Sequence, residues 1–309
     1  MSSRLGEALG GVPLCTLCVV AMCCAVHLAI FLLDTPITMY SIMARNVLYL
    51  GEWYRIITAA FVHASMMHIG FNMMSLLAIG GGLESDLGTV AMTMTVWWSV
   101  ILVGGLYCAG EWLFADVRGG EHAREHLLQQ AVGFSGVIFT LAVMEAQRSS
   151  EPYRMLMGMV KVPTKLYPWA LMIVLQVMMK GEVSFMGHLA GAIVGILHTY
   201  GLTAPLLPSK QMLHDMEDWP GISAMAAALP NFKRCPPPPP AGEQHADSDA
   251  PSLRTLCKGI VGAIAYALTA LWWVISAVLQ IFGLYNPDPP PAGGWEAVAQ
   301  GDVELGSRR

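Results

Sequence analysis

The sequence predicts an all-α membrane protein, and its composition and hydrophobic pattern both lead to that fold class. Hydrophobic residues make up 55% of the 309 residues, charged residues make up 13%, and the mean hydropathy is +0.52. A soluble domain carries about 25% charged residues, so this many apolar side chains cannot all lie inside one water-soluble core. The composition therefore excludes an ordinary cytosolic enzyme and a disordered protein. The net charge of −5, without a long basic run, argues against a nucleic-acid partner.

Seven apolar segments are long enough to serve as membrane-spanning helices, and six of them lie before residue 205. A hydrocarbon core about 30 Å thick requires about 20 apolar residues per helix. The first segment is too long for a signal peptide and no small-residue cleavage site follows it, so we interpret it as a retained helix. The six segments run over residues 12–33, 63–83, 88–110, 130–147, 164–180 and 183–204.

The rest of the chain predicts a linker, a seventh helix and a tail. Residues 205–257 are polar and include Pro236 to Pro240, which is typical of an extended, solvated linker. The segment 258–285 has no charged residue from Gly259 onward and predicts a further span. Proline and acidic residues in 286–309 predict a disordered tail. We therefore expect a six-helix core at 1–204 plus one carboxy-terminal helix.

The positions of Lys and Arg predict the orientation in the membrane. If the amino terminus is cytosolic, ten of the 17 basic residues lie on the cytosolic side and seven lie on the other. The firmest part of this prediction is the short loop after the fourth helix, which carries Arg148, Arg154, Lys161 and Lys165. We expect a multi-pass protein with its amino terminus in the cytosol.

Polar side chains interrupt three predicted helices at a similar depth. The second, fourth and sixth helices enter the bilayer from the same face. About five residues into them lie His68, Ser135 and His188, respectively. At a rise of 1.5 Å per residue, each would lie about 8 Å below the entry plane. Asn72 follows His68 at i+4, on the same helix face. Because polar groups inside a bilayer are costly, their agreement in depth indicates a function.

These residue types are suited to nucleophilic catalysis. A serine hydroxyl is a weak nucleophile until a base removes its proton, and imidazole is the usual base near neutral pH. The resulting oxyanion needs preorganised donors, which His68, Asn72 and the Ser135 backbone N–H could supply. Within the predicted spans, no Asp or Glu lies near the depth of His188 to act as a third member, so the pattern predicts a Ser135–His188 dyad.

Glycines surround both candidate residues. A glycine at every fourth position of the sixth helix is a small-xxx-small pattern, which permits close helix packing: Gly187, Gly191 and Gly195. Gly133 and Gly136 flank Ser135, which removes side chains where another backbone or a substrate must approach.

These residues resemble the three signature elements of the rhomboid intramembrane serine proteases. The resemblance covers residues 12–204, and Trp53 and Arg55 are similar to the W-x-R element of that family's first loop. The combination is specific because the elements occur in the family's order on the corresponding helices. The matching elements are His63-x4-His68-x3-Asn72, Gly133-Phe134-Ser135-Gly136, and Gly187-His188 with Gly191 and Gly195.

The resemblance implies a role for each matched residue. Ser135 would be the nucleophile, His188 the general base, and His68 with Asn72 the stabilisers of the oxyanion. The remaining matched side chains would support the site: His63 as a structural residue, Trp53 and Arg55 at the membrane edge, and Phe139 packed on His188 where many relatives have tyrosine.

The resemblance also implies the substrate and the compartment. The family cleaves membrane-anchored substrates near the outer end of a transmembrane segment without a cofactor, and the fifth helix and residues 180–184 would form a gate and cap. Leu83-Glu84, Leu87-Gly88 and the segment 185–191 are similar to the endoplasmic-reticulum rhomboids. This likeness implies an endomembrane location, transmembrane proteins and lipid as partners, and degradation machinery as a candidate partner.

Two alternatives stand beside the protease. One is a catalytically silent, derlin-type module that escorts membrane proteins, although such relatives typically lose the serine or the histidine. The other is a zinc site, because His122-Ala123-Arg124-Glu125-His126 has the spacing of inverted zinc proteases. That segment is a polar loop with no evident third ligand, so we predict no metal site.

Overall fold

The computed structural model describes residues 10–118, 125–179 and 183–237. Contacts divide the chain into two units, residues 1–265 and 266–309. The predicted seventh helix at 258–285 and the tail at 286–309 lie outside the described residues. The following description therefore concerns the first unit.

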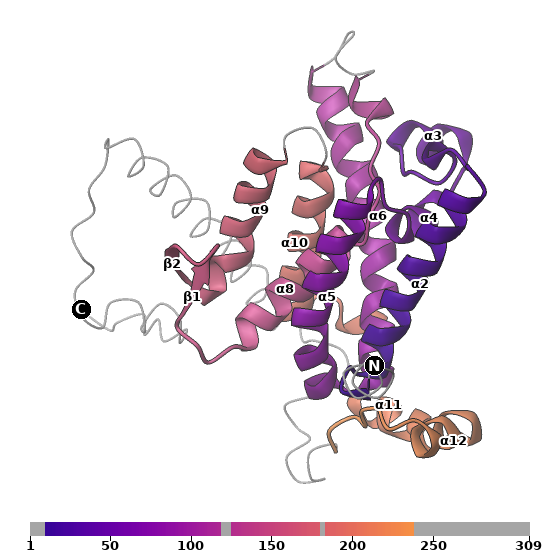
Figure 1. Ribbon diagram of the computed structural model, residues 1–309, viewed down its shortest axis with the longest axis vertical. Helices are drawn as coiled ribbons and strands as arrows, with labels where there is room; N and C mark the ends of the chain where they lie inside the picture. The colour runs from indigo at the N-terminus through magenta and orange to yellow at the C-terminus, as the bar shows by residue number, and fades with distance from the viewer. Residues whose placement is uncertain (1–9, 119–124, 180–182, 238–309) are drawn as a thin grey trace, which may run out of the picture. The chain divides into compact units, whose positions relative to one another are not determined.

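Three of the described helices are each long and apolar enough to cross a membrane. Large apolar side chains on their surfaces, such as Phe31 at 77% exposure, are those expected to face lipid. A fourth candidate span combines residues 185–199 with residues 204–217 after a 90° bend. The three single helices are α2 (Leu14–Leu32), α5 (Met66–Leu87) and α6 (Thr89–Arg118), and Figure 1 shows them running alongside one another.

The other three predicted core helices are shorter than their apolar segments. They are α8 (Ser135–Arg148), α9 (Tyr167–Met178) and α10 (Phe185–Thr199). The prediction of a helix from residue 130 is wrong because the backbone of Ala131 pairs with that of Ile42, in an isolated antiparallel bridge. Hydropathy located the segments, but long-range backbone pairing decided where this helix begins.

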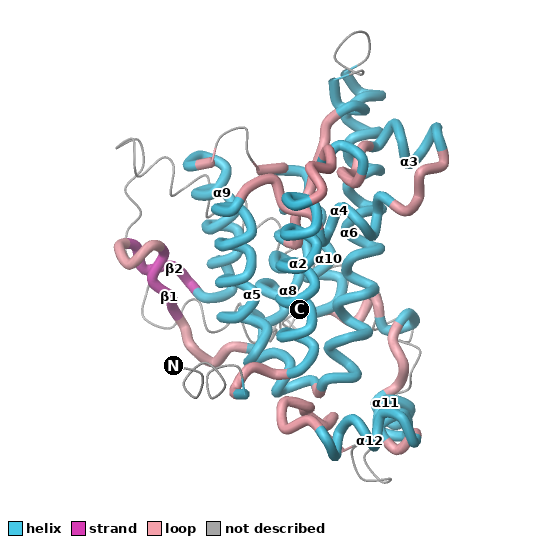
Figure 2. Tube along the Cα trace, turned by 45° about the vertical axis from the view of Figure 1, so that its right-hand side comes forward, coloured by secondary structure: helices cyan, strands magenta, loops and turns pink. Residues whose placement is uncertain are grey.

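Short elements connect the long helices. Between α2 and α5 lie η1 (Ile37–Met39), α3 (Ala44–Leu50) and α4 (Arg55–Phe61). The all-α prediction missed a hairpin between α8 and α9, in which β1 (Tyr153–Leu156) pairs antiparallel with β2 (Val160–Pro163). The turn η2 (Thr164–Leu166) then leads into α9. Figures 1 and 2 show the hairpin next to α9, with which both strands make contact.

The interval after α10 differs from the extended linker that its composition predicts. Residues up to 237 form η3 (Ala204–Leu206), α11 (Lys210–Glu217) and α12 (Pro220–Ala228). The chain then returns to the core, where the Thr89 N–H donates to the Lys233 carbonyl and the Leu14 N–H donates to that of Asn231. The otherwise polar interval contains a few apolar side chains, and these are buried against Val90 of α6: Met216, Phe232 and Cys235.

The main core lies between α2, α5, α6 and α8, and a buried carboxylate joins three of these helices. Glu84, near the end of α5, is completely buried. It accepts hydrogen bonds of 2.8 Å from the backbone N–H groups of Cys15 and Thr16, in the first turn of α2, and one of 2.7 Å from the Thr89 hydroxyl. A carboxylate at a helix amino terminus satisfies free N–H groups and interacts favourably with the helix dipole. Sequence reasoning had assigned Glu84 no structural role.

Candidate active site

The Ser135 hydroxyl and the His188 imidazole form a direct contact. Nε2 of His188 lies 2.9 Å from Oγ of Ser135, a hydrogen-bond distance between the predicted nucleophile and base. Ser135 is the first residue of α8, and His188 lies in the first turns of α10. The Phe139 ring packs on the His188 ring with centroids 4.6 Å apart, as expected from the sequence.

Ser135 lies at a helix amino terminus, and not five residues into a helix as the sequence predicts. The first N–H groups of an α-helix have no partner within the helix and lie at the positive end of its dipole. Gly133 has φ +111°, a conformation that side chains rarely adopt, and a Cβ there would lie 2.8 Å from Nε2 of His68. The chain therefore needs a glycine to turn into α8 beside His68.

His188 is buried, and its helix begins at a serine cap. The Ser184 hydroxyl accepts the Gly187 N–H at 3.1 Å, which satisfies one of the first N–H groups of α10. Nδ1 of His188 is buried without a hydrogen-bond partner in the described part of the chain. The His188 ring is thus positioned by the start of its helix at the Ser184 cap and by packing on Phe139.

Glycines allow α8 and α10 to bring the two residues together. A Cβ on Gly191 would overlap the carbonyl oxygen of Gly136, and one on Gly195 would lie 2.7 Å from the carbonyl oxygen of Thr140. The Thr140 hydroxyl donates to the Gly191 carbonyl at 2.9 Å, which links the two helices directly. The small residues thus allow the backbones of α8 and α10 to touch, as the glycine spacing predicts.

His68 and Asn72 of α5 have different hydrogen-bond partners. Nδ1 of His68 accepts the Ala64 N–H at 3.4 Å, which favours the tautomer with its proton on Nε2, the atom next to Gly133. The Asn72 amide donates to the His68 carbonyl at 2.8 Å. His63 accepts the Phe134 N–H at 3.5 Å, and its ring meets the His68 ring edge-on. His63 is therefore positioned to support the loop before Ser135.

A cavity of about 60 Å³ opens beside the contact between Ser135 and His188. Neither Asn72 nor His63 lines it. A water molecule needs about 10–15 Å³ of such space, so the cavity has room for a few waters. Its lining includes His68, Gly133, Ser135, Gly136, Gly187 and His188.

The loop before Ser135 is held by three segments that the sequence motifs did not connect: α6, α4 and residues 41–42. The Tyr107 hydroxyl of α6 donates to the Gln129 carbonyl at 2.8 Å, and the Gly133 N–H donates to the Ala59 carbonyl of α4 at 2.9 Å. The Ser41 hydroxyl donates to Gln130 at 3.1 Å, next to the bridge between residues 42 and 131. Each contact spans many residues, so no local pattern could have revealed the arrangement.

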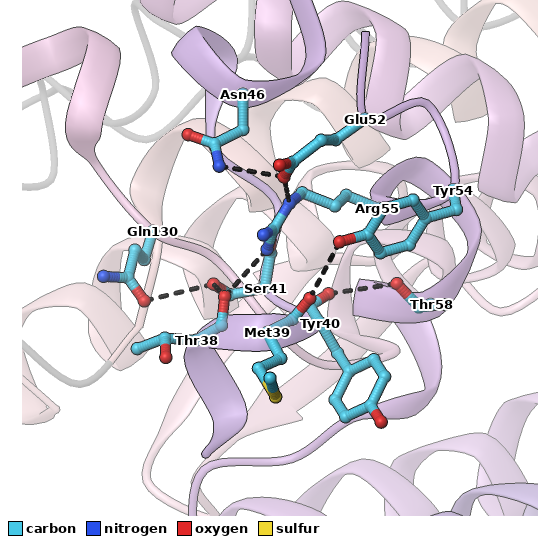
Figure 3. A network of polar contacts seen from close by, with 10 residues as sticks. All are labelled: Thr38, Met39, Tyr40, Ser41, Asn46, Glu52, Tyr54, Arg55, Thr58 and Gln130. Carbon is cyan, nitrogen blue, oxygen red and sulfur yellow. Dashed lines mark hydrogen bonds and ion pairs between the residues drawn. The ribbon is translucent and has the colours of Figure 1, made fainter. Parts of the chain in front are cut away.

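Arg55 connects the short elements that precede α5, whereas Trp53 is 59% exposed. Figure 3 shows the Arg55 guanidinium donating to the carbonyls of Thr38 and Ser41, at 2.8 and 2.7 Å, and to the Glu52 carboxylate. Glu52 also accepts from Asn46 at 2.9 Å, and these hydrogen bonds from Asn46 and Arg55 lower its pKa below 4.5. Arg55 therefore organises the first loop, in agreement with the supporting role implied by the resemblance.

Of the two histidines in the zinc alternative, His126 lies outside the lining of this cavity. Nδ1 of His126 lies 2.9 Å from the Glu111 carboxylate of α6, and its ring stacks on Phe114. His122 lies outside the described residues.

The Rhomboid domain family matches residues 50–205, the part of the chain that contains Ser135, His188 and the α5 residues His68 and Asn72. The chain belongs to the rhomboid family. Membership and the apolar helices together make this rhomboid a multi-pass membrane protein.

Curated relatives agree with this assignment. Rhomboid-like protein 15 of Arabidopsis thaliana is 32% identical over 240 residues, which cover 76% of this chain and 58% of the relative. Rhomboid-related protein 4 of Homo sapiens is 30% identical over 150 residues, 48% of this chain and 46% of the relative. Rhomboid-type serine protease B of Aspergillus fumigatus is 26% identical over 219 residues, 67% of this chain and 73% of the relative. This rhomboid thus spans about half of the length of the first two relatives.

Proposed function

We propose that this rhomboid is an intramembrane serine endopeptidase that cleaves peptide bonds in or near the transmembrane segments of membrane proteins. The observation that carries the proposal is the 2.9 Å contact between the Ser135 hydroxyl and Nε2 of His188. The adjacent cavity supports it, because hydrolysis needs water at membrane depth. The proposed reaction needs no cofactor.

The proposed reaction proceeds in two stages. Nε2 of His188 accepts the Ser135 proton while Oγ forms a bond to the substrate carbonyl carbon. The oxyanion accepts hydrogen bonds from the first N–H groups of α8 and from Nε2–H of His68. The C–N bond breaks as the imidazolium returns the proton to the leaving amine, and a water activated by His188 then hydrolyses the acyl-enzyme.

The length of α8 supports a site below the membrane surface. Its 14 residues extend about 21 Å, which is less than the roughly 30 Å of a hydrocarbon core. If the carboxyl end of α8 lies near one surface, Ser135 lies within the membrane, where a transmembrane substrate can reach it.

The topology is a further part of the proposal. We infer six core helices up to about residue 204, an amino terminus in the cytosol and a seventh span at 258–285, in an endoplasmic-reticulum or related membrane. The transmembrane substrates and any link to degradation machinery belong to this proposal too. Insertion of glycosylation sites at residues 120 and 300 tests the topology, and we expect modification at both. This topology has four spans between the two sites, an even number, so modification at one site alone would contradict it.

The test of the activity compares wild type with Ser135→Ala and His188→Ala. We expect a fluorophosphonate probe to label the wild type alone, and cleavage of a transmembrane substrate to fall by at least about 10³-fold in both variants. Ser150→Ala, at an exposed serine, and His122→Ala are controls that should retain activity.

The competing function is the silent escort. A wild type that neither takes the probe nor cleaves any offered membrane substrate would favour it. Normal cleavage by Ser135→Ala would contradict the dyad, and loss of activity in His122→Ala would favour the zinc alternative.

A further inference from the structure

The β1–β2 hairpin has one face that packs on the protein. Leu156 and Val162 are buried, and their strands contact α9. The Arg154 guanidinium forms a two-armed ion pair with the Glu145 carboxylate at the end of α8, including an Nη1–Oε2 distance of 2.7 Å. The hydrogen bonds that the Arg154 guanidinium donates to the Glu145 carboxylate raise the pKa of Arg154. The hairpin is therefore a folded element with a defined position at the end of α8.

The opposite face and the tip of the hairpin expose apolar side chains. The exposure of Met159 is 78%, one of the largest for an apolar residue in the described part of the chain. Several large exposed apolar side chains on one short connecting segment indicate a contact partner. The exposed residues are Tyr153, Met155, Met157, Met159 and Val160.

The turn at the tip holds a methionine in an unfavourable conformation. Met157 has φ +53° and Gly158 has φ +72°, with the Met159 N–H donating to the Leu156 carbonyl. Turns with positive φ at both central residues favour Asn, Asp or Gly at the first position. A left-handed conformation is sterically unfavourable for a residue with a Cβ, such as methionine. Because Met157 is 52% exposed, its contacts within the chain offer little compensation.

Basic residues border this apolar surface. Lys161 lies opposite Met155 in the register, with its Nζ 4.7 Å from the centroid of the Tyr153 ring. Arg148 is exposed at the end of α8, and Lys165 follows the hairpin in η2. Glu145 is paired with Arg154, so Glu151 is the one remaining acidic residue between 145 and 165. The connection therefore carries a net positive charge beside its apolar tip.

A bilayer surface accommodates both the exposed apolar side chains and the positive charge of the hairpin. Its strands have open edges whose backbone groups need water or headgroups, so it cannot lie within the hydrocarbon. Its methionines avoid water, and apolar side chains can reach about 5–10 Å into the boundary between headgroups and acyl chains. The hairpin connects α8 to α9 in a membrane protein, and the apolar segment 164–178, which contains α9, begins directly after it. The hairpin therefore lies near such a surface already.

We propose that the β1–β2 hairpin docks on an acidic lipid surface, on the side of the membrane away from the cavity at Ser135. Met155, Met157 and Met159 contact the acyl boundary, while Lys161 and Arg148 lie near lipid phosphates. The proposal rests on the membrane location of the chain and does not require protease activity.

The test places a photo-crosslinking benzoylphenylalanine at Met159 in the full chain, in nanodiscs of phosphatidylcholine and phosphatidylserine in equal amounts. Irradiation should yield a protein carrying one phospholipid, detected by intact mass. The same substitution at Phe31, an exposed residue of α2, is the positive control. A crosslink from position 159 to another part of this chain or to a second copy would overturn the proposal. So would the absence of a lipid adduct there while position 31 gives one.

The second part of the test concerns charge. One basic residue near an anionic surface contributes about 1 kcal/mol to the free energy of binding that surface, which corresponds to a factor of about five. Adducts from position 159 should therefore contain phosphatidylserine about fivefold more often than phosphatidylcholine. Arg148→Glu combined with Lys161→Glu should bring the ratio to about one or below, by the same rule. Arg45→Glu, at an exposed site on α3, is the matched charge control and should leave the ratio unchanged. An unchanged ratio in the double variant would refute the contact with lipid phosphates.

Discussion

The two ends of α8 are stabilised in different ways. At the Ser135 end, polar groups are buried, and glycines let α10 and the preceding loop approach closely. At the Arg148 end, an ion pair between Glu145 and Arg154 holds a hairpin whose outer face is apolar and exposed. The Ser135 end depends on close packing, because few side chains fit there. The Arg148 end depends on exposed side chains, and the protein should still fold when many of these are substituted. Substitutions at the Ser135 end should therefore have the larger effects.

The largest difference should lie between His68 and Asn72. His68 lines the cavity with its Nε2 next to Gly133, whereas Asn72 donates to the His68 carbonyl outside the cavity lining. His68→Ala should lower kcat by about 10²–10³-fold, as for the loss of one oxyanion donor. Asn72→Ala should cost less, and part of its effect should be a lower Tm. Equal losses of kcat at an unchanged Tm would show that Asn72 also contacts the oxyanion.

The contact between α8 and α10 can be tested with a pair of glycines. A Cβ on Gly191 would overlap the Gly136 carbonyl, so Gly191→Ala should destabilise the protein by about 1–3 kcal/mol and lower activity. Gly105 lies in α6 with no neighbouring atom within 4 Å of an added Cβ. Gly105→Ala should raise stability by up to about 1 kcal/mol, because alanine favours a helix. Thermal unfolding in detergent measures both, and an unchanged Tm for Gly191→Ala would contradict the close packing.

The first loop should lose stability as the pH falls. Hydrogen bonds from Asn46 and Arg55 lower the pKa of Glu52 in the folded protein, so its contribution is complete above the unfolded value of about 4.5 and disappears as pH falls through the folded pKa. Tm should therefore decline from pH 5 to pH 3 less steeply in Glu52→Gln than in wild type. Parallel curves for the two proteins would show that Glu52 does not stabilise the loop through its charge.

The smallest effect should come from the Glu145–Arg154 pair. Both side chains are partly exposed, so removing the pair by Glu145→Gln should cost about 1 kcal/mol or less. The double substitution Glu145→Arg with Arg154→Glu restores opposite charges and should recover part of that loss. A loss above about 3 kcal/mol in Glu145→Gln would mean that the pair acts as a buried ion pair and that this end is not the tolerant one.

The sequence predicted much of the candidate site because its residues occur in short motifs. Ser135 and His188 could be singled out by their matched depth in helices that enter from the same face, and the glycines at 187, 191 and 195 by their i+4 spacing. The rhomboid assignment is confirmed by the family match. The start of α8 was wrong by five residues because the bridge between Ile42 and Ala131 joins segments 89 residues apart. The hairpin was missed because Met157-Gly158 is an unusual turn pair and the surrounding apolar residues suggested only a connection between helices.

By itself, the sequence determined the helical membrane fold, the order of the polar residues along the chain and the glycine spacing. These properties depend on local composition and on the helical period, and both can be read from residues that are neighbours in the sequence. Tertiary structure decided which side chains line the cavity, where the helix of Ser135 begins, and how residues 205–237 return to the core. Each of these depends on hydrogen bonds or packing between distant segments: Gly133 with Ala59, Tyr107 with Gln129, and Thr89 with Lys233. Such contacts form only when the whole chain is folded, because a buried backbone group finds its partner by position in space and not by proximity in sequence.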